Sequence, residues 1–110
     1  MVNLVNQARA QHGLAPLQSH DGLLQVARAH SPSLVANFAH NPAVGSQIPG
    51  GWMAWGENIA WNSDVNNAHT ALMNSAGHRA NILNPNFTHV GIGIHVENGR
   101  FYITQVFARY

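Results

Sequence analysis

The 110-residue chain contains no cysteine and very little charge. The absence of cysteine excludes a disulfide framework, a thiolate metal site and a thiol nucleophile. Charged residues make up 8% of the chain and hydrophobic residues 45%, a composition that excludes a disordered or highly solvated chain. Five Lys and Arg residues, in no cluster, give a net charge of +1 and cannot track a phosphate backbone. We therefore expect no nucleic-acid partner.

Long apolar runs are also missing, because none approaches the roughly 18 residues that a membrane span needs. Residues 1–9 have a helical pattern and not that of a signal peptide, so for an exported protein we expect the signal to have been removed from this chain. No repeat, low-complexity tract or charge block marks a boundary. We expect one domain, residues 1–110. Histidine is abundant, with eight residues that gain charge as the pH falls toward 6.

Apolar residues at steps of three and four predict three helical segments. Cap residues, glycine stops and one proline set their limits. The expected segments are 2–12 before Gly13, a stretch from the cap Asp21 to Phe38 with a kink or tight restart at Pro32, and one from the cap Ser63 to the stop at Gly77. Residues 40–51 read as a loop.

The clearest local signal is Asn98-Gly99 between two alternating runs, which predicts a two-residue β-hairpin. In the expected register Glu97 lies opposite Arg100, and Val90 lies opposite Phe107. Two glycines on one face, Gly91 and Gly93, would let another element approach the backbone closely. The end of segment 52–61 reads as a further strand. Helices that cover a small antiparallel sheet from both sides give an α+β fold, a three-layer α-β-α sandwich.

Glu57 is the most unusual residue, because it lies among tryptophan, isoleucine and glycine neighbours. A buried carboxylate needs a cationic partner, a metal or a proton of its own. It can equally be a structural acid that accepts backbone N–H bonds and ties down a loop. His40 and His78 flank predicted helix ends, where histidine can simply cap carbonyl groups. Their spacing matches no local ligand motif.

The chain resembles the CAP superfamily of cysteine-rich secretory, antigen 5 and pathogenesis-related proteins, in its short bacterial form. The resemblance covers nearly the whole chain. It is carried by four pieces: Leu4–Arg9 leading to Gly13-Leu14, Phe38-Ala39-His40, Gly56–Ala60, and Asn74–Leu83 continuing to Val90–Gly93 and Thr104–Phe107.

This resemblance implies an α-β-α sandwich with a cleft lined by two histidines and two acids. His40 and His78 match the histidines, and Glu57 matches the first acid. Leu72 stands at the family's tryptophan position and Ser75 at the position of the second acid, so that acid is absent. Family members with the full set bind a divalent metal, commonly zinc. The expected ligands here are His40, His78 and Glu57, with zinc or another divalent metal in a site that keeps a position open.

The resulting hypothesis is a secreted or cell-envelope binding module, monomeric, with an unidentified partner such as a lipid or cell-surface ligand. A metal-dependent hydrolase with Glu57 as its catalytic residue is one alternative. A structural domain without metal is another. Ser75 could also be activated by His78, although a serine that bonds its own backbone is the preferred interpretation. The Trp52, Met53 and Trp55 side chains could form an apolar contact surface, but we favour a lid over the core.

Overall fold

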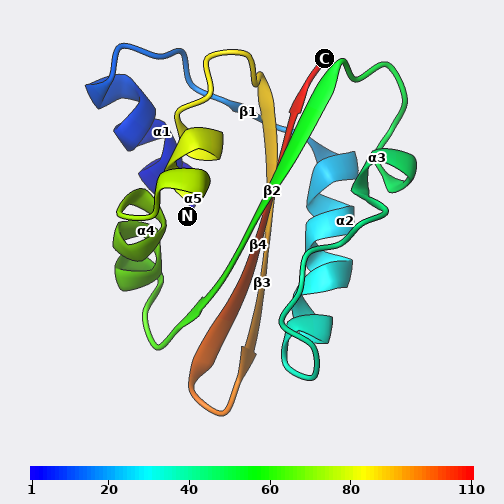
Figure 1. The fold of residues 1–110 in the computed structure, drawn as a ribbon, viewed down its shortest axis with the longest axis vertical. Helices are drawn as coiled ribbons and strands as arrows, with labels where there is room; N and C mark the ends of the chain where they lie inside the picture. The colour runs from blue at the N-terminus through cyan, green and yellow to red at the C-terminus, as the bar shows by residue number, and fades with distance from the viewer.

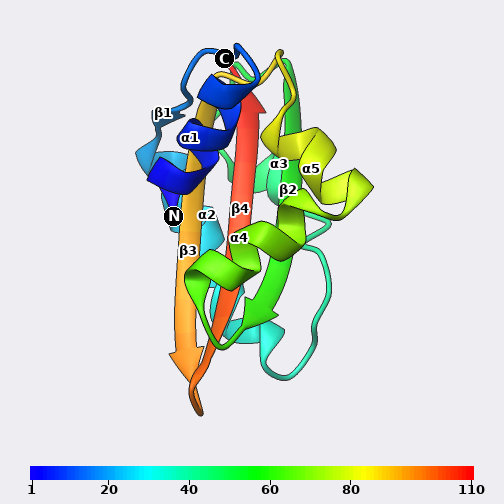
Figure 2. The ribbon, with the colours of Figure 1, turned by 90° about the vertical axis from the view of Figure 1, so that its left-hand side faces the viewer.

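A four-stranded sheet separates two layers of helices in the computed structural model, which describes residues 1–110 (Figure 1). Helices α1, α4 and α5 cover one face of the sheet, and α2 and α3 lie on the other (Figures 1 and 2). The elements are α1 (Val2–Gln11), β1 (Gln18–Ser19), α2 (Asp21–His30), the 3-10 helix η1 (Ser31–Leu34), α3 (Val44–Gln47), β2 (Ala54–Asn62), α4 (Val65–Met73), α5 (Ala76–Ile82), β3 (His89–Glu97) and β4 (Arg100–Arg109). The predicted three-layer sandwich is confirmed. No helix has both the length and the apolar character required to cross a membrane.

The strand order in the sheet is β1-β3-β4-β2. The β3–β4 hairpin has the predicted register, with Glu97 opposite Arg100 and Val90 opposite Phe107. Asn98 and Gly99 both have positive φ, 51° and 75°, as a two-residue hairpin turn requires. The two-residue strand β1, which the sequence did not predict, adds one parallel pairing to β3. Strand β2 pairs with β4 alone, so its other edge is free of any strand.

Two apolar clusters hold the helical layers to the sheet. Val5, Phe87 and Phe107 belong to the cluster under α1, α4 and α5. Leu23 and Val106 belong to the cluster under α2 and α3. As predicted, Gly91 and Gly93 admit a close neighbour: a Cβ at either position would collide with the backbone of α2. Glycine therefore sets how close α2 lies to the sheet.

Arg9 is the largest fully buried side chain, with 1% exposed. Its guanidinium donates to the carbonyl oxygens of Ala15 at 2.8 Å, Asn84 at 2.9 Å and Ile82 at 3.0 Å. The fork of five donors in arginine matches this set of carbonyl acceptors from two separate segments, the loop after α1 and the end of α5 with the residues that follow it. Arg9 thereby ties α1 to the chain that follows α5.

Four of the predicted helix limits are wrong. His20, and not Asp21, caps α2, because its ring nitrogen accepts from the N–H groups of Gly22 and Leu23. Pro32 does restart the helix, but only as η1, so the expected stripe ends at Leu34, which is 1% exposed. Phe38 lies beyond it and is 48% exposed.

The third predicted helix is two helices, and it is capped by Asp64 in place of Ser63. Asn74 ends α4, and Ser75 adopts an extended conformation before α5 begins at Ala76. Both side chain types compete with helical hydrogen bonding, which explains the break. Gly77 is consequently inside the first turn of α5. His78 therefore lies near the N-terminus of a helix and not after a C-terminus.

Candidate functional site

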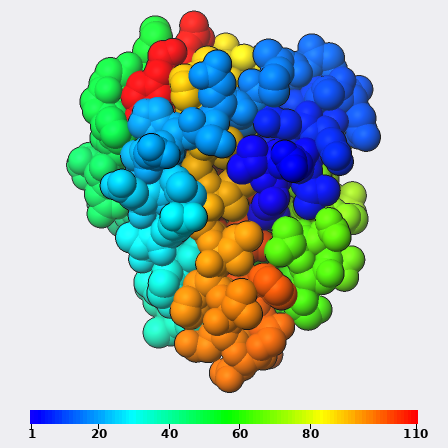
Figure 3. Space-filling model, turned by 180° about the vertical axis from the view of Figure 1, so that it is seen from behind, coloured from blue at the N-terminus to red at the C-terminus, as the bar shows by residue number.

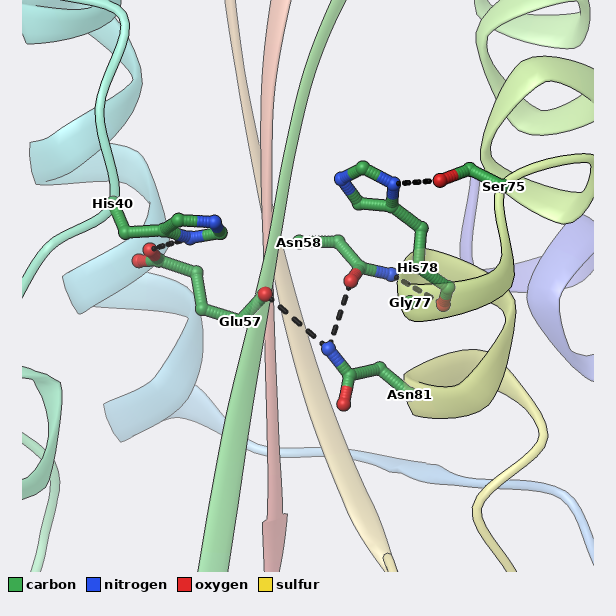
Figure 4. A pocket seen from close by; sticks show the side chains of 7 residues that line it. All are labelled: His40, Glu57, Asn58, Ser75, Gly77, His78 and Asn81. Carbon is green, nitrogen blue, oxygen red and sulfur yellow. Dashed lines mark hydrogen bonds and ion pairs between the residues drawn. The ribbon is translucent and has the colours of Figure 1, made fainter.

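A pocket of about 300 Å³ lies where the free edge of β2 meets the two helical layers. Figure 4 shows His40 on one side of β2, with Ser75, His78 and Asn81 on the other. The seven lining residues include no hydrophobic one: His40, Glu57, Asn58, Ser75, Gly77, His78 and Asn81. All four residues predicted for the cleft therefore line one pocket. A lining of this kind suits a polar or charged ligand.

Glu57 supplies the only formal charge in this pocket, and its side chain is 2% exposed. One carboxylate oxygen, Oε1, accepts from His40 Nδ1 at 2.9 Å and from the N–H of Asn41 at 2.8 Å. The other oxygen, Oε2, is buried and has no partner. A buried oxygen without a partner is costly.

His40 follows η1 in a loop, and its side chain is 62% exposed. Since an ionised carboxylate can only accept, the bond to Glu57 places the proton of a neutral His40 on Nδ1. The lone pair is then on Nε2. In Figure 4 the imidazole extends from the Glu57 carboxylate into the pocket.

His78 faces the pocket from α5, and its Nδ1 lies 2.7 Å from Ser75 Oγ. Ser75 is the residue before α5, yet its side chain makes no capping bond to the helix. The preferred interpretation of Ser75, a bond to its own backbone, is therefore wrong. Its hydroxyl fixes the ring of His78 instead.

Two asparagines that the sequence analysis did not assign to the site hold α5 against β2. Asn58, 1% exposed, donates to the carbonyl of His78 at 3.0 Å and to Gln105 Oε1 at 3.1 Å. Asn81 donates to Asn58 Oδ1 at 2.9 Å and to the carbonyl of Glu57 at 3.3 Å. These bonds fix the position of His78 relative to Glu57. The available signal was the placement of Asn58 beside Glu57 in an apolar strand, where a buried amide needs partners.

The three predicted metal ligands line the same pocket but do not surround one point. No group of three His, Cys, Asp or Glu side chains lies close enough together to hold a metal ion. Glu57 Oε1 is already engaged by His40 and Asn41. Both histidines have Nδ1 held by a polar side chain, which leaves Nε2 as the nitrogen available to a ligand. In metal sites, a hydrogen bond on the other ring nitrogen orients a histidine ligand in this way.

The remaining histidines lie outside the pocket. His20 stacks on Tyr110 at 4.8 Å, and His89 meets both rings edge-on. Burial, and then the neighbouring His20, lower the pKa of His89, and burial raises the pKa of Tyr110. Burial also lowers the pKa of His69, whose Nδ1 is buried without a partner. None of these groups is joined to the cleft by a hydrogen bond.

An apolar pocket of about 210 Å³ adjoins the polar one and shares Ser75 and His78 with it. Its apolar lining comes from the loop before His40, from β2 and from α4: Phe38, Ile59, Ala60, Trp61, Ala68, Ala71 and Leu72. Trp61 is 50% exposed, and Arg100 lies 4.7 Å from its ring centre. The structure thus places an apolar recess at one end of the cleft.

The side chains of Trp52, Met53 and Trp55 differ in how far they are buried. Trp52 is half-buried against the α2–α3 cluster and donates to the carbonyl of Gly45. Met53 and Trp55 are exposed, at 71% and 36%. The predicted lid over the core is confirmed for Trp52 alone.

Comparison with known proteins identifies relatives over nearly the whole chain. The family model for CAP, the cysteine-rich secretory protein family, matches residues 2–107. The uncharacterized protein YkwD of Bacillus subtilis (strain 168) is 40% identical over 115 residues, covering 96% of this chain and 44% of that protein. The chain therefore spans less than half the length of this relative.

Solved structures show the same architecture. An extracellular protein containing a SCP domain from Bacillus anthracis str. Ames aligns with a TM-score of 0.81 at 32% identity, covering 99% of this chain and 39% of that one. A crystal structure of NaASP2 with Zn2+ aligns with a TM-score of 0.77 at 12% identity, over 96% of this chain and 75% of that one. At 12% identity the second likeness shows the fold alone.

Proposed function

Because the chain belongs to the CAP family of cysteine-rich secretory proteins, we propose that it is an extracellular binding module whose polar cleft takes up a divalent metal, such as zinc, between His40 and His78. The observation that carries this proposal is the fixing of both imidazoles through Nδ1, by Glu57 and by Ser75. An extracellular location is supported by the description of the matched Bacillus anthracis protein as extracellular. The Zn2+ in NaASP2 gives a precedent for metal in this fold.

His40 Nε2 and His78 Nε2 are the atoms that would hold the ion. Neutral imidazole suits zinc, and two protein ligands leave positions open for water or for a group of the partner. Glu57 and Ser75 act as positioning residues, because they engage Nδ1 and not the ion. The free Oε2 of Glu57 places negative charge beside the site and adds electrostatic attraction for a cation. A bound zinc ion would supply a Lewis-acid centre for a partner's oxygen or nitrogen.

The proposal is tested by calorimetric titration of ZnCl₂ at pH 7.5. We expect one ion per chain, with at least a tenfold loss of affinity in both His40→Ala and His78→Ala. Glu57→Gln should lose roughly tenfold by weakening the orientation and basicity of His40. His95→Ala is the matched control, because His95 lies on β3 outside the pocket, and it should bind as the unaltered protein does.

The same titration separates this proposal from a structural role of the cleft. Since imidazole must be neutral to bind metal, affinity should be lower at pH 5 than at pH 7.5. No uptake at pH 7.5, or uptake that persists unchanged at pH 5 and in both histidine variants, would contradict a histidine metal site.

A hydrolase is a second candidate function, favoured by the 2.7 Å contact between Ser75 Oγ and His78 Nδ1. In the tautomer with a bare Nδ1, His78 could accept the proton of Ser75 as the hydroxyl attacks a carbonyl carbon. In the tautomer that binds metal, Nδ1 donates to Ser75 instead. A hydrolase predicts turnover of p-nitrophenyl acetate or casein that is lost in Ser75→Ala, whereas a binding module shows no turnover above buffer.

A further inference from the structure

The free edge of β2 is a nine-residue strand face that the fold leaves open. Strand β2 pairs in unbroken register with β4 from Ala54 to Asn62 and with no strand on its other side. The bond from Asn81 Nδ2 to the carbonyl of Glu57 shows that the main chain of Glu57 faces this free edge. Alternate residues of an antiparallel strand face the same way. Trp55, Ile59 and Trp61 therefore present their N–H and C=O groups there as well.

Apart from the bond from Asn81, this edge lacks the usual features that keep sheet edges from pairing. Natural proteins protect such edges with lysine, proline, bulges or a covering element. Strand β2 has no lysine or proline, and its only charged residue, Glu57, bonds to His40. Figure 4 shows the strand in front of the rest of the sheet, between His40 on one side and His78 on the other. The edge is open along the floor of the cleft.

The polar and apolar pockets follow one another along this edge. The polar pocket takes Glu57 and Asn58 from β2, and the apolar pocket takes Ile59, Ala60 and Trp61. Both pockets are lined from both sides of the strand, and they share two residues of the α4–α5 side. The step from Asn58 to Ala60 is two residues, or about 7 Å at ~3.3 Å per residue. An extended chain places side chains on one face at this same interval.

We propose that the free edge of β2 binds an extended peptide by β-strand addition. One polar side chain of the peptide enters the His40–His78 cleft, and an apolar side chain two positions away enters the pocket beside Trp61. Main-chain groups at Trp55, Ile59 and Trp61 supply affinity, and the two pockets supply specificity. The proposal rests on the binding role of the cleft, but it does not require the metal.

A peptide fits these observations better than a lipid does. The apolar pocket, at about 210 Å³, is below the 300–1,000 Å³ range typical of small-molecule sites and suits one side chain better than an acyl chain. A lipid tail has no groups to pair with main-chain N–H and C=O groups at the strand edge, whereas a peptide main chain pairs with them.

The test uses acetylated, amidated seven-residue peptides of threonine that carry one Phe and one polar residue (Asp, His or Lys) two positions apart, in either order. Binding is followed by amide chemical shifts of the isotope-labelled protein, with and without EDTA. We expect the largest shifts along residues 55–61. Moving the two residues to adjacent positions should weaken binding about tenfold. N-methylation of the peptide amides that face β2 should do the same while leaving every side chain unchanged.

A matched pair of protein variants tests the apolar pocket. Ala71 on α4 lines it, whereas Ala80 on α5 does not, and both residues are exposed. Ala71→Trp should fill the pocket and lower peptide affinity at least tenfold, and Ala80→Trp should leave it unchanged. Both variants should bind zinc as the unaltered protein does, so a loss of peptide binding is separable from a failure of the metal site.

Three results would overturn the proposal: no binding by any peptide of the set, equal binding of the N-methylated peptides, or equal binding to the Ala71→Trp variant. Phosphatidylcholine–phosphatidylglycerol vesicles that bind and shift the same residues, where the peptides do not, would assign the groove to lipid instead. Peptide binding in EDTA by a protein that takes up no zinc would support strand addition while contradicting the metal site.

Discussion

Two residues decide the chemistry of the cleft, Glu57 and Ser75. The apolar neighbours of Glu57 predicted a buried acid with a partner, and the structure supplies that partner in His40. The preferred interpretation of Ser75, a bond to its own backbone, is wrong because it rests only on hydrogen-bond partners that are close in the sequence. The helix break that turns Ser75 toward His78 comes from Asn74-Ser75 together with tertiary packing of α5, which a local pattern does not contain.

Replacing Ser75 by glutamate should tighten zinc binding, because it restores the second acid that the family resemblance assigns to this position. A carboxylate bonded to His78 Nδ1 makes Nε2 a more basic ligand than a hydroxyl does. We therefore expect zinc affinity to rise roughly tenfold. Zinc titration of Ser75→Glu measures the gain. Thr70→Glu adds the same charge on the exposed surface of α4 and should change affinity less than twofold. A gain as large in the control would attribute the effect to net charge alone.

At the level of elements, the parts with strong local signals were predictable. The hairpin register, α1 and the close approach of a helix at Gly91 and Gly93 follow from turn chemistry and periodicity. Strand β1 was missed because two residues carry no periodic pattern, and its pairing with β3 is tertiary. The position of β2 at a free edge of the sheet could not be predicted either, because strand order depends on which strands pair in the folded protein.

The packing of α2 on β3 should be sensitive to a single methyl group. In Gly93→Ala the new Cβ would meet the backbone of Ala27, which cannot move as a flexible side chain would. We expect a loss of about 1–3 kcal/mol of unfolding free energy, measured by urea denaturation. Gly50→Ala is the control, because no atom lies within 4 Å of its Cβ, and it should have little effect. Equal midpoints for the two variants would show that α2 has room to shift.

For the whole molecule, stability should depend on pH through the half-buried His69. Burial lowers the pKa of His69 in the folded state. The unfolded chain then takes up a proton at higher pH than the folded one. The contribution of neutral His69 to the free energy of unfolding is therefore complete above about pH 6.5, and it declines as the pH falls below this value.

The expected outcome is a lower urea midpoint at pH 5.5 than at pH 7.5. His69→Gln should reduce that difference, because a side chain that does not titrate removes this part of the linkage. If the urea midpoint falls by the same amount between the two pH values in the variant and in the unaltered protein, His69 does not contribute to the pH dependence of stability.

The architecture as a whole gathers the cleft at one place, the free edge of β2, with one histidine from each helical layer (Figure 4). The opposite side of the molecule, seen in Figure 3, exposes β3, where Ile94 and Val96 are 40% and 54% exposed. None of the three pockets is lined by a residue of β3. The two edges of the same sheet therefore differ in chemistry, and the proposed binding role belongs to β2.

The most direct test of this account is a crystal structure of the protein grown with equimolar zinc, with anomalous data collected on both sides of the zinc edge. We predict one strong anomalous peak per chain, between His40 Nε2 and His78 Nε2, with Glu57 and Ser75 still bonded to the Nδ1 atoms. A map with no peak in the cleft, or with its main peak at the His20–His89–Tyr110 cluster, would contradict the assignment of the cleft as the metal site.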